Sequence, residues 1–205
     1  IKISKIGNTN LIVLIYPDAY KMCGIAGKYY FADQNITGPE LKTLADKINH
    51  RGPDDSGIYI SPDRKLGLVN RRLAVIDLSQ AGHQPMSYKE RFWITYNGEI
   101  YNFREERKKL QRLGYKFRSE SDTEVILALY DKYKEKCVNR LRGMFSFCIY
   151  DKKENTIFLA RDRVGVKPLK YFITNKVFIF ASEAKAILSQ KEAVIQPDYQ
   201  ALSMY

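Results

Sequence analysis

The strongest constraint on the fold is a pair of successive β-hairpins in the second half of the chain. An apolar run over residues 142–150 is followed by a turn at 152–155 and a second apolar run over 156–161. The runs 169–173 and 177–181 repeat this arrangement, with Thr-Asn-Lys between them. Connections this short join antiparallel strands. The second half of the chain is therefore predicted to contribute two hairpins to antiparallel sheets.

The remaining predicted elements follow no regular strand–helix alternation. Apolar alternation predicts further strands over residues 24–31, 56–60, 66–77 and 91–101. Capping signals and helical periodicity predict helices over residues 37–48 and 103–113, after the Ser-Asp-Thr-Glu string at 121–124, and after Ser-Glu at 182–183. Because strands and helices are not arranged as repeated βαβ units, we expect an α+β protein with antiparallel sheets covered by helices.

Size and cysteine content restrict the class of protein further. A chain of 205 residues with 45% hydrophobic residues is long enough for one domain with a proper core. The three cysteines, Cys23, Cys137 and Cys148, are an odd number without paired spacing. This pattern argues against a disulfide framework and a zinc site, and it favours a reducing compartment such as the cytoplasm.

The net charge of +11 raises the question of nucleic-acid binding. The basic residues are spread along the chain, apart from a modest cluster over residues 104–112 on a predicted helix, where a solvated face is the usual explanation. No zinc-finger or RNP-type string accompanies them. The apolar run at 11–16 is too short to span a bilayer. We therefore expect neither a nucleic-acid partner nor a membrane, and the charge is equally suited to an acidic partner surface.

The dipeptide Met22-Cys23 carries the candidate chemistry. If translation starts at Met22 and the methionine is removed, Cys23 becomes the first residue. Its α-amino group, with a pKa of about 7.7–8.0, then lies within reach of its own thiol and can act as its base. The alternative is a buried small hydrophobic residue, which is the usual role of a free cysteine.

The first 22 residues differ in character from the rest of the chain. The chain opens with isoleucine, and a proline ends its only early apolar run. We expect residues 1–22 to be an upstream extension or a propeptide outside the fold, and residues 23–205 to form the domain. With the extension attached, Cys23 has an amide in place of its amine.

A set of short strings, in a fixed order, carries a family resemblance. They are Met22–Gly27, His50–Asp54, Arg71–Asp77, Asn97–Asn102, Ser121–Glu124, Arg142–Phe145, Ala160–Arg163 and Phe180–Glu183. Together they resemble the glutaminase domain of glutamine-dependent asparagine synthetases, a class II glutamine amidotransferase of the N-terminal-nucleophile hydrolase superfamily. The resemblance extends from Met22 to the C-terminus. It implies a four-layer αββα sandwich with two antiparallel sheets between helical layers.

The resemblance also implies catalytic roles. Cys23 resembles the nucleophile that attacks the side-chain amide of glutamine. Asn97 and Gly98 resemble the oxyanion hole, with a side-chain amide and a backbone N–H as donors. Without the resemblance, Asn97-Gly98 is typical of a hairpin turn.

Substrate-binding roles are implied in the same way. Arg72 resembles the residue that pairs with the substrate α-carboxylate, although the adjacent Arg71 leaves the choice between the two open. Glu99 and Asp122 resemble the groups that hold the α-ammonium, and Asp122 is also suited to the start of a helix. Further residues implied to line or support the site are Leu73, Ala74, Val75, Ile76 and Arg51.

The implied function is hydrolysis of glutamine to glutamate and ammonia, which an ATP-dependent domain then uses to make asparagine from aspartate. We expect no cofactor or metal in this domain, with ATP and Mg²⁺ confined to the synthetase domain. The pyrophosphate-binding string Ser-Gly-Gly-x-Asp-Ser does not occur here, so that domain is expected to be absent. A different ammonia acceptor, a homodimer, and a non-catalytic interaction domain in which Cys23 is never exposed remain open.

Overall fold

The computed structural model describes residues 22–73 and 79–194. The strands in these residues form two antiparallel sheets. The first sheet has five strands in the order β2 (Asp55–Ile60), β3 (Leu66–Arg72), β1 (Gly24–Tyr30), β9 (Val177–Ala181) and β8 (Lys170–Ile173). The second has four, in the order β4 (Met86–Tyr88), β5 (Phe92–Ile100), β6 (Gly143–Asp151) and β7 (Thr156–Arg161).

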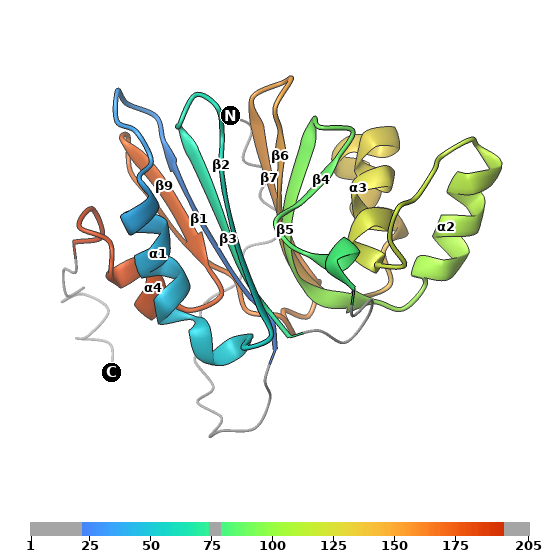
Figure 1. Ribbon diagram of the computed structural model, residues 1–205, viewed down its shortest axis with the longest axis horizontal. Coiled ribbons are helices and arrows are strands. Elements are labelled where there is room, and N and C mark those ends of the chain that lie inside the picture. Colours follow the sequence, from blue (N-terminus) through green and yellow to red (C-terminus); the bar gives the residue numbers. More distant parts are fainter. Residues whose placement is uncertain (1–21, 74–78, 195–205) are drawn as a thin grey trace, which may run out of the picture.

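The helices lie on the outer faces of the two sheets. They are α1 (Gly38–Lys47), α2 (Phe103–Arg112), α3 (Asp122–Tyr133) and α4 (Ala184–Leu188), with short 3₁₀ segments η1 (Asn49–Arg51), η2 (Gln80–Gly82) and η3 (Lys134–Arg140). Figure 1 shows α1 and α4 outside the first sheet and α2 and α3 outside the second, with the two sheets facing each other. The predicted four-layer α+β sandwich is confirmed.

Three apolar clusters fill the spaces between these four layers. One contains Leu41 and Leu44 of α1 against the first sheet, and one contains Val125 and Leu129 of α3 against the second. The third lies between the sheets and includes Ile25 of β1. Strand β1 is consequently buried along its whole length. A strand covered on both faces needs apolar residues in succession rather than in alternation.

Most predicted boundaries agree with the structure to within one or two residues. Both hairpins form, as β6–β7 and β8–β9. The capping box at Thr37 is complete, because the Thr37 side chain accepts from the N–H of Glu40 and the Glu40 side chain accepts from the N–H of Thr37. Helix α2 ends before Gly114, whose φ of +86° suits a residue without a side chain.

Three local predictions were wrong. The strand predicted over 66–77 ends at Arg72, with Leu73 outside it, and residues 74–77 lie outside the described part of the chain. Ser121 does cap α3, but the carboxylate of Glu124 accepts hydrogen bonds from the N–H groups of Arg118 and Ser119 and does not complete a capping box. The third is the predicted cap of α4, because the side chain of its N-cap residue makes no hydrogen bond to the helix backbone.

Ser182 forms hydrogen bonds with β1 of the first sheet instead of capping α4. Its Oγ accepts a hydrogen bond from the N–H of Ile25 at 3.0 Å, and its own N–H donates to the Ile25 carbonyl at 2.8 Å. The N-cap position of α4 is Glu183, whose side chain makes no capping bond. The Ser-Glu pair at the end of β9 therefore fixes the beginning of β1, where the candidate nucleophile lies.

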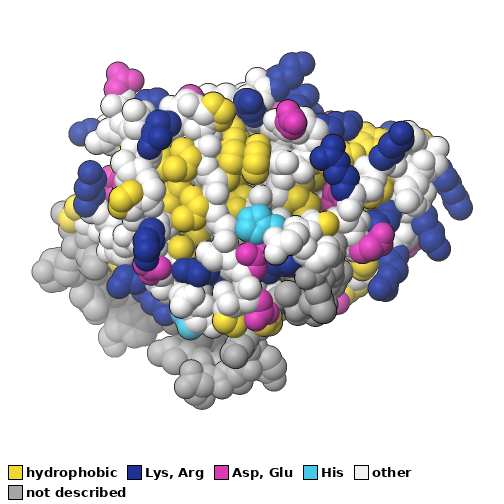
Figure 2. Space-filling model, in the orientation of Figure 1, with side chains coloured by type: hydrophobic (Ala, Val, Ile, Leu, Met, Phe, Trp, Pro, Cys, Tyr) yellow, Lys and Arg dark blue, Asp and Glu magenta, His cyan; other side chains and the backbone are white. Residues whose placement is uncertain are grey.

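The surface carries its positive charge without a single basic patch on the face shown in Figure 2. Lys and Arg side chains are spread around that face, and hydrophobic side chains gather toward its middle. Within the described residues, no helix combines the length and the apolar character needed to cross a membrane.

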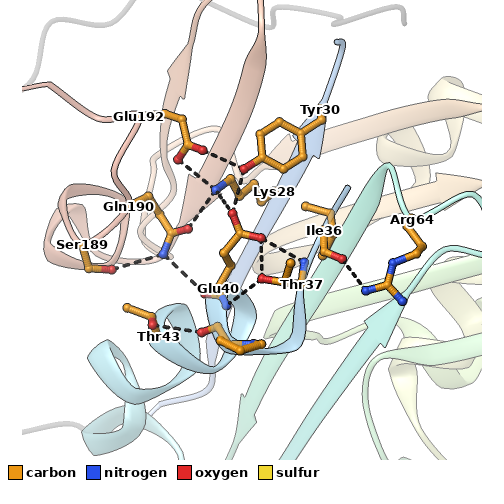
Figure 3. Close-up of polar contacts among 11 residues, drawn as sticks. Lys28, Tyr30, Ile36, Thr37, Glu40, Thr43, Arg64, Ser189, Gln190 and Glu192 are labelled. Atoms are coloured by element: carbon orange, nitrogen blue, oxygen red, sulfur yellow. Dashed lines mark hydrogen bonds and ion pairs between the residues drawn. The ribbon is translucent and has the colours of Figure 1, made fainter. Parts of the chain in front are cut away.

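A buried lysine joins β1 to α1 and to the segment after α4 (Figure 3). The Nζ atom of Lys28 lies 2.9 Å from carboxylate oxygens of both Glu40 and Glu192, and 3.2 Å from Oε1 of Gln190. The Lys28 side chain is fully buried. Burial would raise the pKa of Glu40, but hydrogen bonds from Lys28 and Thr37 outweigh it and lower the pKa to about 2. The stability that Glu40 contributes is thus present above its ordinary value of 4.5 and is lost as the pH falls toward 2.

Replacing Lys28 with methionine is expected to destabilise the fold strongly. The variant leaves two carboxylates facing each other without the cation between them, and breaking a buried ion pair costs about 3–5 kcal/mol. Chemical denaturation at neutral pH measures the loss. The control is Lys42→Met, because Lys42 forms an exposed i,i+4 pair with Asp46 on the same helix layer. Equal losses in the two variants would contradict a structural role for the Lys28 cluster.

Candidate functional site

The candidate nucleophile lies immediately before the central strand of the first sheet. Pairing of β1 with β3 places Gly24 opposite Arg71, so that Cys23 lies near the end of β3. The Cys23 Sγ accepts a hydrogen bond from the N–H of Leu73 at 3.3 Å, and the thiol lies 3.5 Å from the Leu73 carbonyl. Arg72 is buried at the end of the same strand. The ends of β1 and β3 therefore bring Cys23, Arg72 and Leu73 together.

The second sheet supplies Asn97, Gly98 and Glu99 from within β5. These residues pair with β6, where Asn97 faces Ser146 and Gly98 faces Phe145. The interpretation of Asn97-Gly98 as a hairpin turn is therefore wrong, because both residues lie inside a nine-residue strand. A Cβ added at Gly98 would lie only 2.3 Å from the Met144 carbonyl oxygen, so the close approach of β6 requires glycine here.

The side-chain amide of Asn97 is unusual for a buried group. Asn97 is 1% exposed, and its Nδ2 has no hydrogen-bond partner among the described residues. Buried donors are nearly always paired in folded proteins, since an unpaired one costs about 1–3 kcal/mol. An unpaired amide beside a cavity is therefore a donor available to a bound group.

Asp122 lies in the first turn of α3 and connects that helix to β5. Its Oδ2 accepts hydrogen bonds from the hydroxyl of Tyr96 at 2.7 Å and from the N–H of Ile100 at 3.0 Å. Burial raises the pKa of the Asp122 carboxyl, and these two hydrogen bonds oppose the shift. Burial also raises the pKa of the Tyr96 hydroxyl, and the Asp122 carboxylate raises it further. The pair holds the carboxylate in a fixed orientation at the wall of the site.

Arg51 holds the backbone of Cys23 through its guanidinium. Its Nε donates to the Cys23 carbonyl at 3.1 Å, and its Nη1 lies 2.9 Å from Oε1 of Glu183. His50 lies 2.9 Å from the same carboxylate oxygen. Burial would raise the pKa of Glu183, but hydrogen bonds led by that from Arg51 lower it. Glu183 thus orients the guanidinium of Arg51, which in turn holds the backbone of Cys23.

A cavity of about 190 Å³ gathers these groups. The predicted site residues that line it are Cys23, Arg72, Leu73, Asn97, Gly98, Glu99 and Asp122. Arg51 does not line the cavity and contacts Cys23 through its backbone carbonyl. Ala74, Val75 and Ile76 lie outside the described residues.

Sequence reasoning missed several lining residues. These are Met22, Gly82, Gln84, Tyr96, Ser121, Thr123, Met144 and Lys167. Tyr96 and Thr123 adjoin predicted site residues, so proximity in the sequence is a signal that would have found them. Lys167 follows the Ala160–Arg163 string by only a few residues, but nothing local indicates that its side chain enters the cavity.

The electrostatics of Cys23 combine opposing effects. Burial raises the pKa of its thiol above the ordinary value, and the Leu73 N–H and the cations of Arg72 and Lys167 reduce this rise without cancelling it. Asp122 adds a smaller increase. The surroundings thus contain specific features that favour a thiolate in an environment that otherwise opposes it.

The sequence pattern of the glutamine amidotransferase domain matches residues 22–205. The chain belongs to this family. Among sequence relatives, this amidotransferase domain is 42% identical over 188 residues to glutamine-hydrolysing asparagine synthetase 1 of Bacillus subtilis, in a match that covers 90% of this chain and 29% of that protein. It is 41% identical over 150 residues to asparagine synthetase 1 of Arabidopsis thaliana, covering 72% of this chain and 25% of that one. The chain thus spans less than a third of the length of these relatives.

Among solved structures, the amidotransferase domain is similar to the glutamine phosphoribosylpyrophosphate amidotransferase of B. subtilis. The TM-score is 0.67 at 20% sequence identity, and the match covers 82% of this chain and 43% of that one. At this level of identity the likeness establishes the shared fold. Among the described residues of this domain, no group of three or more His, Cys, Asp and Glu side chains is placed to hold a metal ion.

Proposed function

We propose that this domain hydrolyses glutamine to glutamate and ammonia, with Cys23 as the nucleophile. The observation that carries the proposal is the convergence on one cavity of the Cys23 thiol, the unpaired amide of Asn97 and buried groups of both charges, Arg72 and Asp122. A free amino acid that carries a side-chain amide has the matching groups. It presents an α-carboxylate, an α-ammonium and an electrophilic carbonyl carbon.

The reaction proceeds by covalent acyl transfer. Removal of Met22 frees the amino group of Cys23, which takes the thiol proton directly or through a water. The sulfur then bonds to the amide carbon, and the oxyanion accepts hydrogen bonds from Asn97 Nδ2 and the Gly98 N–H. The carbon–nitrogen bond breaks, and the proton from the amine leaves with the nitrogen as ammonia. Water then hydrolyses the thioester and restores the thiol.

Met22 has a double effect on this site. It joins the nitrogen of Cys23 in a peptide bond, and it also lines the cavity. Its removal therefore both exposes the base and widens the space for substrate. This chemistry requires no cofactor or metal.

The α-carboxylate and the α-ammonium, which share the α-carbon of the substrate, are proposed to contact different sides of the cavity. Arg72 on the first sheet binds the α-carboxylate, because a guanidinium offers two parallel donors to a carboxylate. Asp122 and Glu99, from α3 and β5, bind the α-ammonium. Leu73 holds the Cys23 sulfur through its N–H.

Substitution of Arg72 by lysine is expected to raise the KM for glutamine by roughly ten- to a hundredfold. A single ammonium replaces a two-pronged contact, and a hydrogen bond to a charged group contributes about 1.5–3 kcal/mol. Steady-state kinetics of glutamate release measure the effect, with Arg71→Lys as the matched control. Arg71 points to α1, where its guanidinium contacts the Ala45 carbonyl and Asp46. A larger rise in KM for Arg71→Lys would reverse the assignment.

The ammonia is proposed to pass to an ATP-dependent synthetase that makes asparagine from aspartate. The similarity to glutamine-hydrolysing asparagine synthetases supports this use of the ammonia. In those relatives the matched region is less than a third of the protein's length. ATP and Mg²⁺ belong to that synthetase.

The experiment that tests the proposal is a product assay. A chain expressed from Met22 keeps all described residues, and processing of its methionine exposes Cys23. Incubation with glutamine should yield glutamate and ammonia in equal amounts, and mass spectrometry of acid-quenched samples should detect the acyl group on the Cys23 peptide. Asparagine serves as the control substrate. A correctly processed chain that releases no glutamate would overturn the proposal.

A further inference from the structure

Lys167 is held at the cavity by a turn that fixes both of its backbone polar groups. Asp162 accepts hydrogen bonds from the N–H groups of Val166 at 2.8 Å and Lys167 at 3.0 Å. The Nε of Arg161 donates to the Lys167 carbonyl at 2.6 Å. Gly165 has a φ of +73°, which permits the tight turn. The position of Lys167 is thus built by the residues that precede it in the turn.

The side chain of Lys167 is buried without a carboxylate partner. The residue is 6% exposed and lines the cavity, and its Nζ lies 2.9 Å from the sulfur of Met22. A thioether is only a weak acceptor. Within the described part of the chain, no carboxylate lies within ion-pair distance of this ammonium. Lysines are almost never fully buried unless paired, so an unpaired one beside a nucleophile calls for a functional explanation.

Burial lowers the pKa of Lys167, and the nearby Cys23 opposes this shift. The reciprocal effect appears at the nucleophile, where Arg72 and Lys167 lower the pKa of the thiol. The two groups are therefore electrostatically coupled across the cavity. Lys28, by contrast, is buried beside the carboxylates of Glu40 and Glu192, which offset the cost of burying its charge.

We infer that Lys167 is a positioning residue whose ammonium group favours the thiolate of Cys23 and so increases the reactivity of the nucleophile. This role of Lys167 rests on the proposed function, in which Cys23 is the nucleophile. The substrate carboxylate is assigned to Arg72, so the charge of Lys167 is left to act on the sulfur. The attack requires a thiolate, which a cation across the cavity stabilises.

Other charged or titratable groups also face Cys23. They are Arg51 on the Cys23 carbonyl, with Glu183 bound to Arg51, and the lining residues Arg72 on β3, Tyr96 and Glu99 on β5, and Asp122 on α3. Arg51 binds the Cys23 carbonyl and is paired with Glu183, and Asp122 is paired with Tyr96. Unlike Arg51, Lys167 has no acidic partner within contact distance among the described residues.

The test is the rate at which iodoacetamide alkylates Cys23 in the 205-residue chain. The sulfur forms a bond to carbon as iodide leaves, so the rate follows the thiolate population and requires neither glutamine nor a free amine. Peptide mass spectrometry separates Cys23 from the two buried cysteines. In Lys167→Met, alkylation at pH 7 should be slower by about three- to tenfold, since an opposite charge nearby shifts a pKa by about one unit. Lys167→Arg should retain the wild-type rate.

Two further variants complete the design. Lys167→Gln supplies a second neutral side chain if Lys167→Met does not fold, and protection of Cys137 and Cys148 from alkylation reports folding. Lys176→Met is the charge control, because Lys176 is exposed in the turn between β8 and β9.

Unchanged alkylation in the neutral variants would overturn the inference, as would equal slowing in Lys167→Arg or Lys176→Met. The outcome is independent of the product assay. Slower alkylation of the neutral variants in a protein that releases no glutamate would support the electrostatic role and contradict only the proposed function. In an active chain exposed at Cys23, the acid limb of kcat/KM should move to higher pH in Lys167→Met and remain in place in Lys167→Arg.

Discussion

Replacing Cys23 with alanine is expected to lower glutamate release by at least about 10⁴-fold, because removal of a covalent nucleophile leaves only binding and oxyanion stabilisation. The alanine variant keeps the strand that Cys23 precedes, since the hydrogen bond from Arg51 goes to the backbone carbonyl. Substrate binding should therefore survive while chemistry is lost. The measurement is single-turnover glutamate release by chains that begin at residue 23, with glutamine affinity measured separately by calorimetry.

Cys137→Ala provides the matched control for the loss of a thiol. Cys137 is buried beside α3, and burial raises the pKa of its thiol to about 12, so it is an unreactive core residue. Its replacement should leave kcat unchanged and lower stability slightly. If Cys23→Ala and Cys137→Ala released glutamate at the same rate, Cys23 would not be the nucleophile.

Replacing Asn97 with alanine is expected to lower kcat by about 10²- to 10³-fold with little change in KM, because an oxyanion donor acts mainly in the transition state. The structural reason is that Asn97 Nδ2 is buried without a partner among the described residues at the cavity wall. The same substitution removes an unsatisfied donor, so the folded state should not be destabilised by loss of a native hydrogen bond from Nδ2. Steady-state kinetics together with thermal unfolding separate these two effects.

Ser146→Ala is the control for Asn97→Ala. Ser146 faces Asn97 across the β5–β6 pair and also has a buried side-chain oxygen without a partner among the described residues, but it does not line the cavity. Its substitution tests whether a small change at this point of the sheet is enough to disturb catalysis. A kcat loss in Ser146→Ala as large as that in Asn97→Ala would point to a distorted sheet rather than a missing donor. A rise in KM alone would assign Asn97 to ground-state binding.

Some features of this protein are determined by residues close together in the sequence. The hairpin of β6 and β7 arises from two apolar runs and a four-residue turn, and the cap of α1 arises from Thr37 and Glu40. Such elements are predictable because their hydrogen bonds join residues a few positions apart. The position of β1 is also visible in the sequence, since an apolar, glycine-punctuated run comes directly after Cys23, but its hydrogen bonds go to the distant strands β3 and β9.

Other local patterns have two structural solutions, and the choice depends on the surroundings. Asn97-Gly98 has the composition of a hairpin turn but lies within β5, because pairing with β6 along nine residues outweighs local turn preference. Glu124 has the spacing of a capping box, yet its carboxylate binds the N–H groups of the preceding loop. Ser182 is placed to cap a helix and instead holds Ile25 of β1.

By itself, the sequence determined the α+β class, most strand and helix positions, and the presence of a cysteine suited to N-terminal chemistry. Only the tertiary structure decided that Cys23, Asn97 and Asp122 share a cavity, that the amide of Asn97 has no partner among the described residues, and that Lys167 lines the same cavity. The physical reason is the distance along the chain between the residues that interact. Turns and caps depend on neighbouring residues, whereas the site depends on how two sheets, paired in register and packed through an apolar layer, bring together the ends of strands far apart in the chain.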